Sequence, residues 1–477
     1  MTGHPESNII FYSFFGFLIL IGLVFSRSMD KDVNHYFSTG LSTGGGSISY
    51  SIFLLALFQA LMILIPNIAG QSLSAGTIFL ISVAAVVPML FGKQMKYFAE
   101  KLSDYNSRTA SMFLNSIGLI FLCSVQLLVL VQVADFVIIQ FFGSSQYSML
   151  VVMIVATGIY VMAGGLKAVL YANIITGSLS IISLFFVIAN AMLWKYQLFF
   201  SFRTAFHSGS DIFRVSGFTE TNLVIVGIGI VLMMYWMTGL SVGELLRMAP
   251  AAKQNIFSRK LFMLGVVVCL LLVGVLFLTT TGTEFDSPVT VNLLNPIDYF
   301  VAIGFLGGLM GIFAITFHMA SSIVALRLYP SLKSEVGEEE QILVGRLSTV
   351  FVVLLSIILI SFVKISGFKT FIWYNNFIAF FFTPITAALI STMIVKKGAA
   401  IGFIFGMLTG ETYAVIEFIS QQFEIHPSVL QSTSPYAFAI EIAFVSLFAG
   451  MVAAKTSEMV IIQKIFSRIK ILRSTML

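Results

Sequence analysis

The residues of this sequence that could do chemistry are polar side chains isolated inside long apolar runs. Gln59 and Gln126 each place an amide in such a run, and His318 places an imidazole in another. An amide in apolar surroundings needs a hydrogen-bonding partner, so each glutamine either contacts a polar solute or ties two helices together. An imidazole titrates at about pH 6.5, which makes His318 a candidate proton-binding site. A hydrogen-bonded structural histidine is the alternative.

Three further residues extend the set of candidates. Tyr374 and Asn375 begin the apolar run at 369–395, where they could face an outer vestibule and contact a solute. Asp135 lies near the end of the run that contains Gln126, so it is either a functional intramembrane carboxylate or a group that reaches water. No paired catalytic residues and no cluster of metal ligands occur within these runs. The sequence therefore argues against an intramembrane enzyme and predicts no bound cofactor.

The composition places these residues in a membrane protein. Of the 477 residues, 58% are hydrophobic and only 10% are charged. A soluble globular domain carries about 25% charged residues, so a bilayer is the solvent that accepts this much apolar surface. The net charge of +5 needs no nucleic-acid partner, because Lys and Arg collect in loops on one side of the membrane.

The elements that must position the candidate residues are membrane-spanning helices. Apolar runs of roughly 18 to 30 residues recur along the whole chain and predict about 13 transmembrane helices in an all-α polytopic fold. The runs are 9–26, 47–69, 73–92, 109–142, 147–163, 166–192, 219–246, 258–281, 298–326, 343–363, 369–395, 399–421 and 435–456. Cationic loops such as 93–108 and 247–260 predict an outer N-terminus and a cytoplasmic C-terminus, although the outer loop at 195–218 also carries three cations.

One stretch between two of these runs carries a recognisable pattern. Residues 160–177 read YVMAGGLKAVLYANIITG. They resemble the GGL-x-AV-x-WTD-x-x-Q signature of the sodium/solute symporter family. The chain departs from that signature at Tyr171, at Asn173 in place of the family Asp, and at Thr176 in place of the Gln.

Six other stretches resemble the same family in the same order. They are HYFSTGLS (35–42), SVQLLVLVQVAD (124–135), YWMTGLSVGELLRMAPAAK (235–253), MASSIVALRLYP (319–330), EEEQILVGRLSTVF (338–351) and KKGAAIGFIFGMLTG (396–410). The resemblance implies a leucine-transporter-type core of two inverted five-helix repeats, at about 47–192 and 219–395. The runs 9–26, 399–421 and 435–456 are then peripheral helices. In such folds the first helix of each repeat is interrupted near the bilayer midplane, where solute and ion bind.

The resemblance also implies roles for particular residues. It puts Gln59 in the interrupted part of the first core helix, and it gives Tyr235 a role in covering the solute, with Thr238 nearby. Core packing is the alternative for Tyr235. The implied sodium-site region comprises Gln59, Met62, Asn173, Gly308, Gly311 and Ile312. The hydroxyl pair that the family places on its eighth core helix falls on Gly311 and Ile312, which carry no hydroxyl. With the neutral Asn173, this predicts a degraded sodium site.

These observations predict a secondary active transporter of the cytoplasmic (inner) membrane that imports a small polar organic solute by alternating access. The coupling ion is Na⁺ by family resemblance, with H⁺ or no ion as alternatives that follow from the residues. A second hypothesis is a transport-incompetent solute sensor or partner subunit that keeps the symporter fold. No Arg lies in the middle of a span to clamp a carboxylate, which disfavours acidic solutes bound through a cation.

Overall fold

The computed structural model describes residues 5–26, 33–37, 48–58, 108–142, 146–194, 227–233, 267, 296–333, 335–366, 369–395, 398–422 and 435–457. Every regular element in these ranges is a helix, which confirms the predicted all-α class. Two compact units emerge from the chain contacts: residues 1–217 with 238–372, and residues 218–237 with 373–477. This division does not follow the two inverted repeats, so the repeat boundaries stay a prediction.

Within the described residues, five helices are long and apolar enough to cross a membrane: Asn115–Ile139, Tyr147–Phe186, Tyr299–Leu332, Glu338–Phe362 and Phe438–Ser457. The helix α14 (Glu338–Ser366) exposes a stripe of large apolar side chains at helical spacing, namely Leu343, Leu347, Val350, Phe351, Leu354, Ile358 and Phe362. Lipid tails are the natural environment for such a stripe. The helix begins with three glutamates, so the stripe starts where the chain leaves the aqueous loop.

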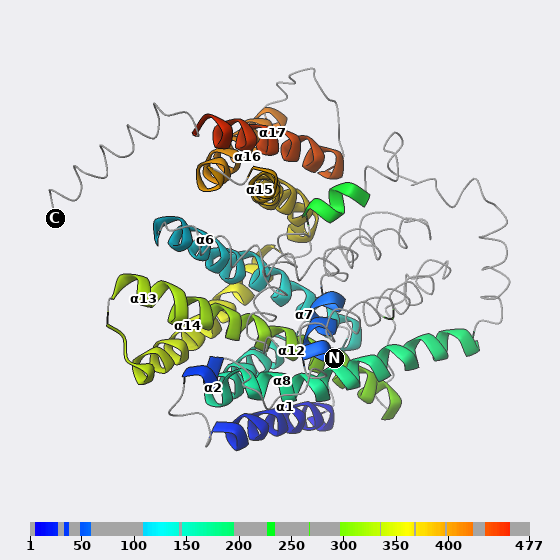
Figure 1. Cartoon of the computed structure of the whole chain (residues 1–477). Coiled ribbons are helices and arrows are strands. Elements are labelled where there is room, and N and C mark those ends of the chain that lie inside the picture. Colours follow the sequence, from blue (N-terminus) through cyan, green and yellow to red (C-terminus); the bar gives the residue numbers. More distant parts are fainter. Residues whose placement is uncertain are drawn as a thin grey trace. The chain divides into compact units, whose positions relative to one another are not determined.

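The helix α12 (Pro296–Ile323) lies at the centre of the first unit. All its side chains from Leu306 to Ile323 are buried, whereas α14 buries one face only. A helix that is apolar on all sides fits such a position, because no face has to meet water. The helices α7 (Leu127–Phe142), α8 (Tyr147–Trp194) and α14 pack against α12 (Figure 1).

The helix α8 is bent where the sequence predicted a boundary between two spans. Gly165 has φ 56° and ψ −154°, a left-handed conformation that an L-residue adopts only with strain. The two predicted runs, 147–163 and 166–192, are therefore the two arms of α8. The helix α1 (Pro5–Ser26) packs along α8, where Gly22 lets its backbone approach Tyr160 closely.

The remaining elements of the first unit follow the predicted runs with one addition. The run at 109–142 forms α6 (Arg108–Ile120), the π-helical turn η1 (Phe121–Gln126) and α7. The centre of the unit continues from α12 into the π-helical turn η3 (Val324–Leu328) and α13 (Tyr329–Leu332). A helix also covers Ile48–Phe58, inside the predicted run at 47–69. The addition is the short helix α2 (Val33–Phe37), which no apolar run predicts.

In the second unit, α15 (Lys369–Ile394), α16 (Ala399–Gln422) and α17 (Pro435–Ser457) match their predicted runs to within one residue at nearly every end. The helices α16 and α17 meet along small residues: Gly402, Gly406 and Gly410 on α16 face Ser446, Gly450 and Ala454 on α17. Small residues four apart allow two membrane helices to approach closely. The Ser446 hydroxyl donates to the carbonyls of Pro384 and Gly406, each at 2.8 Å, and so fastens all three helices.

Candidate functional site

A seam between α8 and α12 positions the candidate site. The Ser180 hydroxyl lies 2.7 Å from the Gly304 carbonyl oxygen on α12, and the Ser183 hydroxyl lies 3.3 Å from that of Phe300. A Cβ at Gly304 or Gly308 would collide with these hydroxyls. The two helices are therefore antiparallel here, and serine side chains on one lie directly on the backbone of the other.

Further along this seam, Leu54, Asn173 and Thr176 lie against Gly311. Together with Ser51, the partner of Asn173, we call these residues the Gly311 cluster. A Cβ at Gly311 would lie 2.7 Å from Asn173 Oδ1, 2.7 Å from Leu54 Cδ1 and 3.0 Å from Thr176 Oγ1. Asn173 Nδ2 donates to Ser51 Oγ at 2.8 Å. The cluster thus joins the helix over Ile48–Phe58, α8 and α12 at one buried point.

Every side-chain oxygen atom in the Gly311 cluster belongs to a neutral group. Asn173 Oδ1 and Thr176 Oγ1 are buried and have no hydrogen-bond partner among the described residues. An unpaired buried acceptor is costly, so two of them beside a missing side chain mark a place that a water molecule or a cation could fill. Both unpaired oxygen atoms belong to α8. On α12, Gly311 and Ile312 supply no hydroxyl group.

One turn further along α12, a chain of hydrogen bonds includes the predicted residue Gln126. Its Nε2 donates to Thr316 Oγ1 at 2.9 Å, and the Thr316 hydroxyl donates to the Ile312 carbonyl at 2.9 Å. All three residues are buried. Gln126 therefore ties the end of η1 to α12, which was one of the two alternatives for this amide.

The structure buries His318 on α12, against the short helix α2. Its ring centroid lies 6.2 Å from that of Tyr36 and 5.9 Å from that of Phe37. The backbone of Phe37 interacts with the ring, but neither ring nitrogen makes a hydrogen bond of normal geometry with a described residue. Its role, as a proton-binding site or as a structural histidine, stays a prediction.

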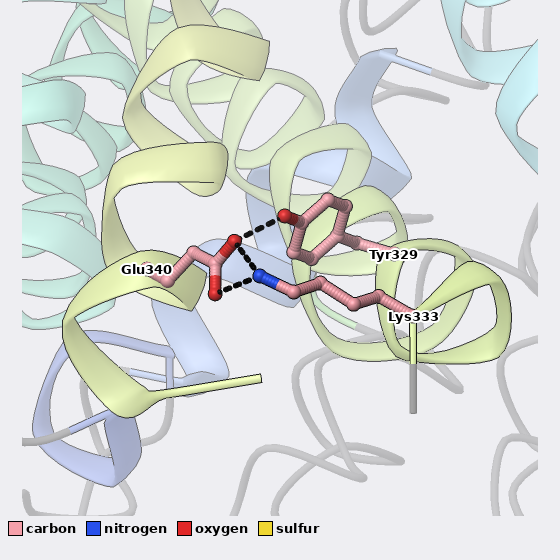
Figure 2. A network of polar contacts seen from close by, with 3 residues as sticks. All are labelled: Tyr329, Lys333 and Glu340. Carbon is pink, nitrogen blue, oxygen red and sulfur yellow. Dashed lines mark hydrogen bonds and ion pairs between the residues drawn. The ribbon is translucent and has the colours of Figure 1, made fainter. Parts of the chain in front are cut away.

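A polar network joins the end of α13 to the start of α14. Glu340 accepts hydrogen bonds from the Tyr329 hydroxyl and from Lys333 Nζ, the latter at 2.6 Å and 2.8 Å (Figure 2). The bond to Glu340 raises the pKa of Lys333 above its ordinary value. Nearby in the fold, Arg327 donates to Asn115 Oδ1 at 2.6 Å and joins η3 to α6. Together these bonds connect three segments of the chain at one end.

Several predicted site residues lie outside the described residues. These are Gln59, Met62, Tyr235 and Thr238; Tyr374 and Asn375 lie in the described backbone of α15, but their side chains do not belong to the described set. Of the remaining candidates, Asn173, Gly308 and Gly311 lie along one seam. Ile312 and His318 are on α12, and Gln126 of η1 bonds Thr316 on that helix.

Sequence reasoning missed the partners in the seam. Ser51, Ser180 and Ser183 did not figure among the candidates, and Thr176 figured only as a departure from a motif. A signal was available: Thr176, Ser180 and Ser183 recur at helical spacing on α8, as Gly304, Gly308 and Gly311 do on α12. Matching stripes of small residues indicate two membrane helices in close contact.

Comparison with known proteins finds a family whose model matches part of this chain. The model of the sodium:solute symporter family matches residues 289–410, a segment that begins before α12 and ends within α16. The sodium/myo-inositol cotransporter 2 of Bos taurus is 28% identical over 141 residues, covering 28% of this chain and 21% of that protein. The sodium/glucose cotransporter 2 of Rattus norvegicus is 30% identical over 118 residues, covering 24% and 18%. The matched segments thus span about a fifth of these relatives.

A solved structure extends the similarity of fold over nearly the whole chain. It is described as the substrate-bound outward-open state of a Na⁺-coupled sialic acid symporter, and it matches with a TM-score of 0.72 over 94% of this chain and 97% of that one. The sequence identity is 14%, so this likeness concerns the fold. It agrees with the all-α, leucine-transporter-type membrane fold predicted from the sequence.

Proposed function

We propose that this chain, a member of the sodium:solute symporter family, imports a small polar organic solute across the cytoplasmic membrane by alternating access. The observation that carries the proposal is the shared fold with a Na⁺-coupled symporter over 94% of the chain. The family model supports it independently, because its matched segment includes α12, the most deeply buried helix of the described structure. The predicted orientation is an outer N-terminus and a cytoplasmic C-terminus.

The solute is held by amides, hydroxyls and aromatic rings in this proposal. Its predicted contacts are Gln59, Gln126, Tyr235, Thr238, Tyr374 and Asn375. Neutral polar groups of this kind suit a neutral or zwitterionic solute with several hydrogen-bonding groups, since bidentate recognition of a carboxylate uses Arg. Thr316 then has a second role, because its bond to Gln126 holds the amide in one orientation.

The coupling ion is the second part of the proposal. Desolvated Na⁺ needs about five or six oxygen ligands, and a negative charge nearby strengthens its binding. The Gly311 cluster offers two unpaired neutral oxygens, while the Ile312 carbonyl is engaged by Thr316. These features support a sodium site that is weakened, so that uptake depends little on sodium and is driven by protons or by the solute gradient alone.

Uptake by the purified full chain in proteoliposomes tests both parts. Sodium and proton gradients are imposed separately, and a panel of radiolabelled polyols, sugars, amino acids and vitamins is screened. We expect uptake of at least one neutral or zwitterionic solute, with little change when the sodium gradient is removed. Accumulation driven by sodium alone would overturn the weakened site and leave the transport proposal standing.

The geometry of the Gly311 cluster also favours a second function, a solute sensor or partner subunit. The hydrogen bond from Asn173 to Ser51 joins two helices with a fixed protein contact at a place where the family resemblance implies an exchangeable ion. A fixed contact of this kind would suit a protein that binds solute without cycling. Saturable solute binding by the purified chain, with no uptake under any gradient, would favour this function over transport.

A further inference from the structure

The short helix α2 packs against the bend of α8, the last turns of α12 and the first turns of α14. Its residues Tyr36 and Phe37 are completely buried, although α2 has only five residues and cannot be stable by itself. They form one apolar cluster with Ala325 of η3 and Ile342 of α14. The helix is therefore held by its tertiary contacts, and loss of those contacts would release it.

Close fits at two glycines shape the space that α2 occupies. At Gly165 of α8, a Cβ would lie 2.5 Å from the Tyr36 carbonyl oxygen, and at Gly345 of α14 it would collide with the Phe37 ring. The Tyr36 hydroxyl donates to the Met162 carbonyl at 3.0 Å, next to the bend of α8. The two aromatic rings thus fill a site built by α8, α12 and α14, at the end where Glu340 and Lys333 pair.

His318 is the ionisable group of α12 that faces this aromatic pair. It lies two residues from Thr316, the partner of Gln126, so α2 packs against the same segment of α12 as a predicted solute contact, on another face of the helix. The ring is 1% exposed, and neither nitrogen has a normal hydrogen bond to a described residue. A proton added here would create a buried cation, which is costly without a paired anion.

The charged group that lies against the aromatic pair is also a cation. The Arg346 guanidinium of α14 lies 5.6 Å from the centroid of the Tyr36 ring and adds a second cation to the cluster. Burial raises the pKa of Tyr36 to about 12, so this side chain stays neutral. On α8, Lys167 Nζ lies over the Phe25 ring of α1; at the ends of η3 and α13, Arg327 and Lys333 are bonded to Asn115 and Glu340. On α7, the carboxyl group of Asp135 lies more than two turns beyond Gln126 along the chain.

We propose that α2 is a proton-sensitive cytoplasmic gate, which closes the inner end of the transport path over His318 and opens when His318 binds a proton. That α2 controls a transport path rests on the proposed transport function, whereas its packing against His318 does not. With the gate closed, the imidazole is neutral and sealed from water by Tyr36 and Phe37. When α2 withdraws, water reaches the ring, and a proton from the cytoplasm then binds Nδ1 or Nε2 and stabilises the open gate.

The sign of the pH dependence follows from linkage. A proton that binds only the open form shifts the equilibrium toward that form as the pH falls. The shift begins near the ordinary pKa of an exposed histidine, about 6.5, and amounts to roughly tenfold for each pH unit below it. Acid on the cytoplasmic side therefore favours the open gate, and alkaline conditions favour the closed gate.

Cysteine labelling of α2 tests this proposal on the full chain in lipid nanodiscs. In a background with Cys123→Ser and Cys269→Ser, Val33→Cys places a thiol on the half-buried edge of α2, and Glu335→Cys gives an exposed reference thiol. The ratio of their rates with a water-soluble maleimide cancels the pH dependence of the thiols themselves. We expect this ratio to rise roughly tenfold between about pH 8 and about pH 5.5.

The matched variants are His318→Gln and His318→Asn, which keep a polar side chain but cannot gain the charge. In either variant that folds, as judged by a monodisperse elution profile, the ratio should stay the same at both pH values. A constant ratio in the protein with His318, or an equal rise in a variant, would overturn the gate. Labelling needs neither solute nor gradient, so this result is independent of whether the chain transports.

Discussion

Asn173 on α8 and Gly311 on α12 approach so closely that a Cβ on the glycine would lie 2.7 Å from the amide oxygen. That oxygen has no partner among the described residues, while the amide nitrogen of the same side chain donates to Ser51. The contact brings a residue of the predicted first repeat against a residue of the second. Substitutions at Asn173 and at Gly311 therefore test this contact.

Substitution Asn173→Asp should strengthen sodium binding. The carboxylate would add a negative charge beside Thr176 and Gly311, and a charge a few ångströms away contributes several kcal/mol at an effective dielectric constant of about 20. After discounting for the cost of burying the carboxylate, we expect at least about a tenfold gain in Na⁺ affinity. Sodium-dependent thermal stabilisation of the purified protein measures this gain. Thr176→Val, which removes an oxygen, should lower any residual Na⁺ affinity. If neither variant changes the sodium-dependent stabilisation, the Gly311 cluster does not bind the ion.

Substitution Gly311→Ala should destabilise the fold. The new methyl group would meet Leu54, Asn173 and Thr176 within 3.0 Å, and overpacking of this kind costs about 1–3 kcal/mol. Gly16→Ala on α1 is the matched control, because its Cβ would meet nothing within 4 Å and alanine favours the helix by about 1 kcal/mol. Thermal unfolding in detergent compares the two. Equal midpoints would contradict the close approach of α8 and α12.

Variants of Gln126 and Thr316 should show whether Gln126 contacts the solute or only forms a hydrogen bond between two helices. Both Gln126→Leu and Thr316→Val break the same 2.9 Å bond and should cost similar stability, about 0.6 kcal/mol for an average hydrogen bond between membrane helices. If Gln126 also binds the solute, its variant should raise KM by about tenfold, corresponding to one lost hydrogen bond, and Thr316→Val by less. Uptake kinetics measure the difference. Equal KM values in both variants would leave Gln126 with the structural role alone.

The pair of Lys333 and Glu340 should be intact around neutral pH and be lost at both extremes. The hydrogen bond raises the pKa of Lys333, so the lysine's contribution is lost as the pH rises through the raised value. The bonds from Lys333 and Tyr329 lower the pKa of Glu340, so the carboxylate's contribution is lost only in acid. NMR titration of the lysine side chain should show this value falling toward normal in Glu340→Gln. The melting temperature should change little, because the pair is exposed to water. A large loss of stability near neutral pH would contradict this description.

Much of the fold could be predicted from the sequence, because long apolar runs and glycine pairs act locally. The bend of α8 followed from Gly164 and Gly165, and the bounds of α15, α16 and α17 followed from the ends of their runs. The helix α2 could not be predicted in this way. Five residues carry no periodic pattern, and Tyr36 and Phe37 become helical and buried only through contacts with residues more than a hundred positions away.

The candidate site was predictable in part. The family resemblance singled out Asn173 and Gly311, and a place inside an apolar run singled out His318, but a sequence does not state which polar group each one meets. Asn173 bonds Ser51, and His318 faces α2, because of how distant helices pack. The stripes of serine on α8 and glycine on α12 contained this information about packing, since each hydroxyl on one helix requires a missing side chain on the other.

The seam of α8 and α12 places a constraint on how this chain can diverge. Each hydroxyl of Ser180 and Ser183 fills the volume that a side chain at Gly308 or Gly304 would need. A bulkier residue on α12 is then acceptable only together with a smaller one at the facing position of α8. Across descendants of this gene, positions 183 and 304 should therefore change in pairs, as should positions 180 and 308, even where neither touches solute or ion.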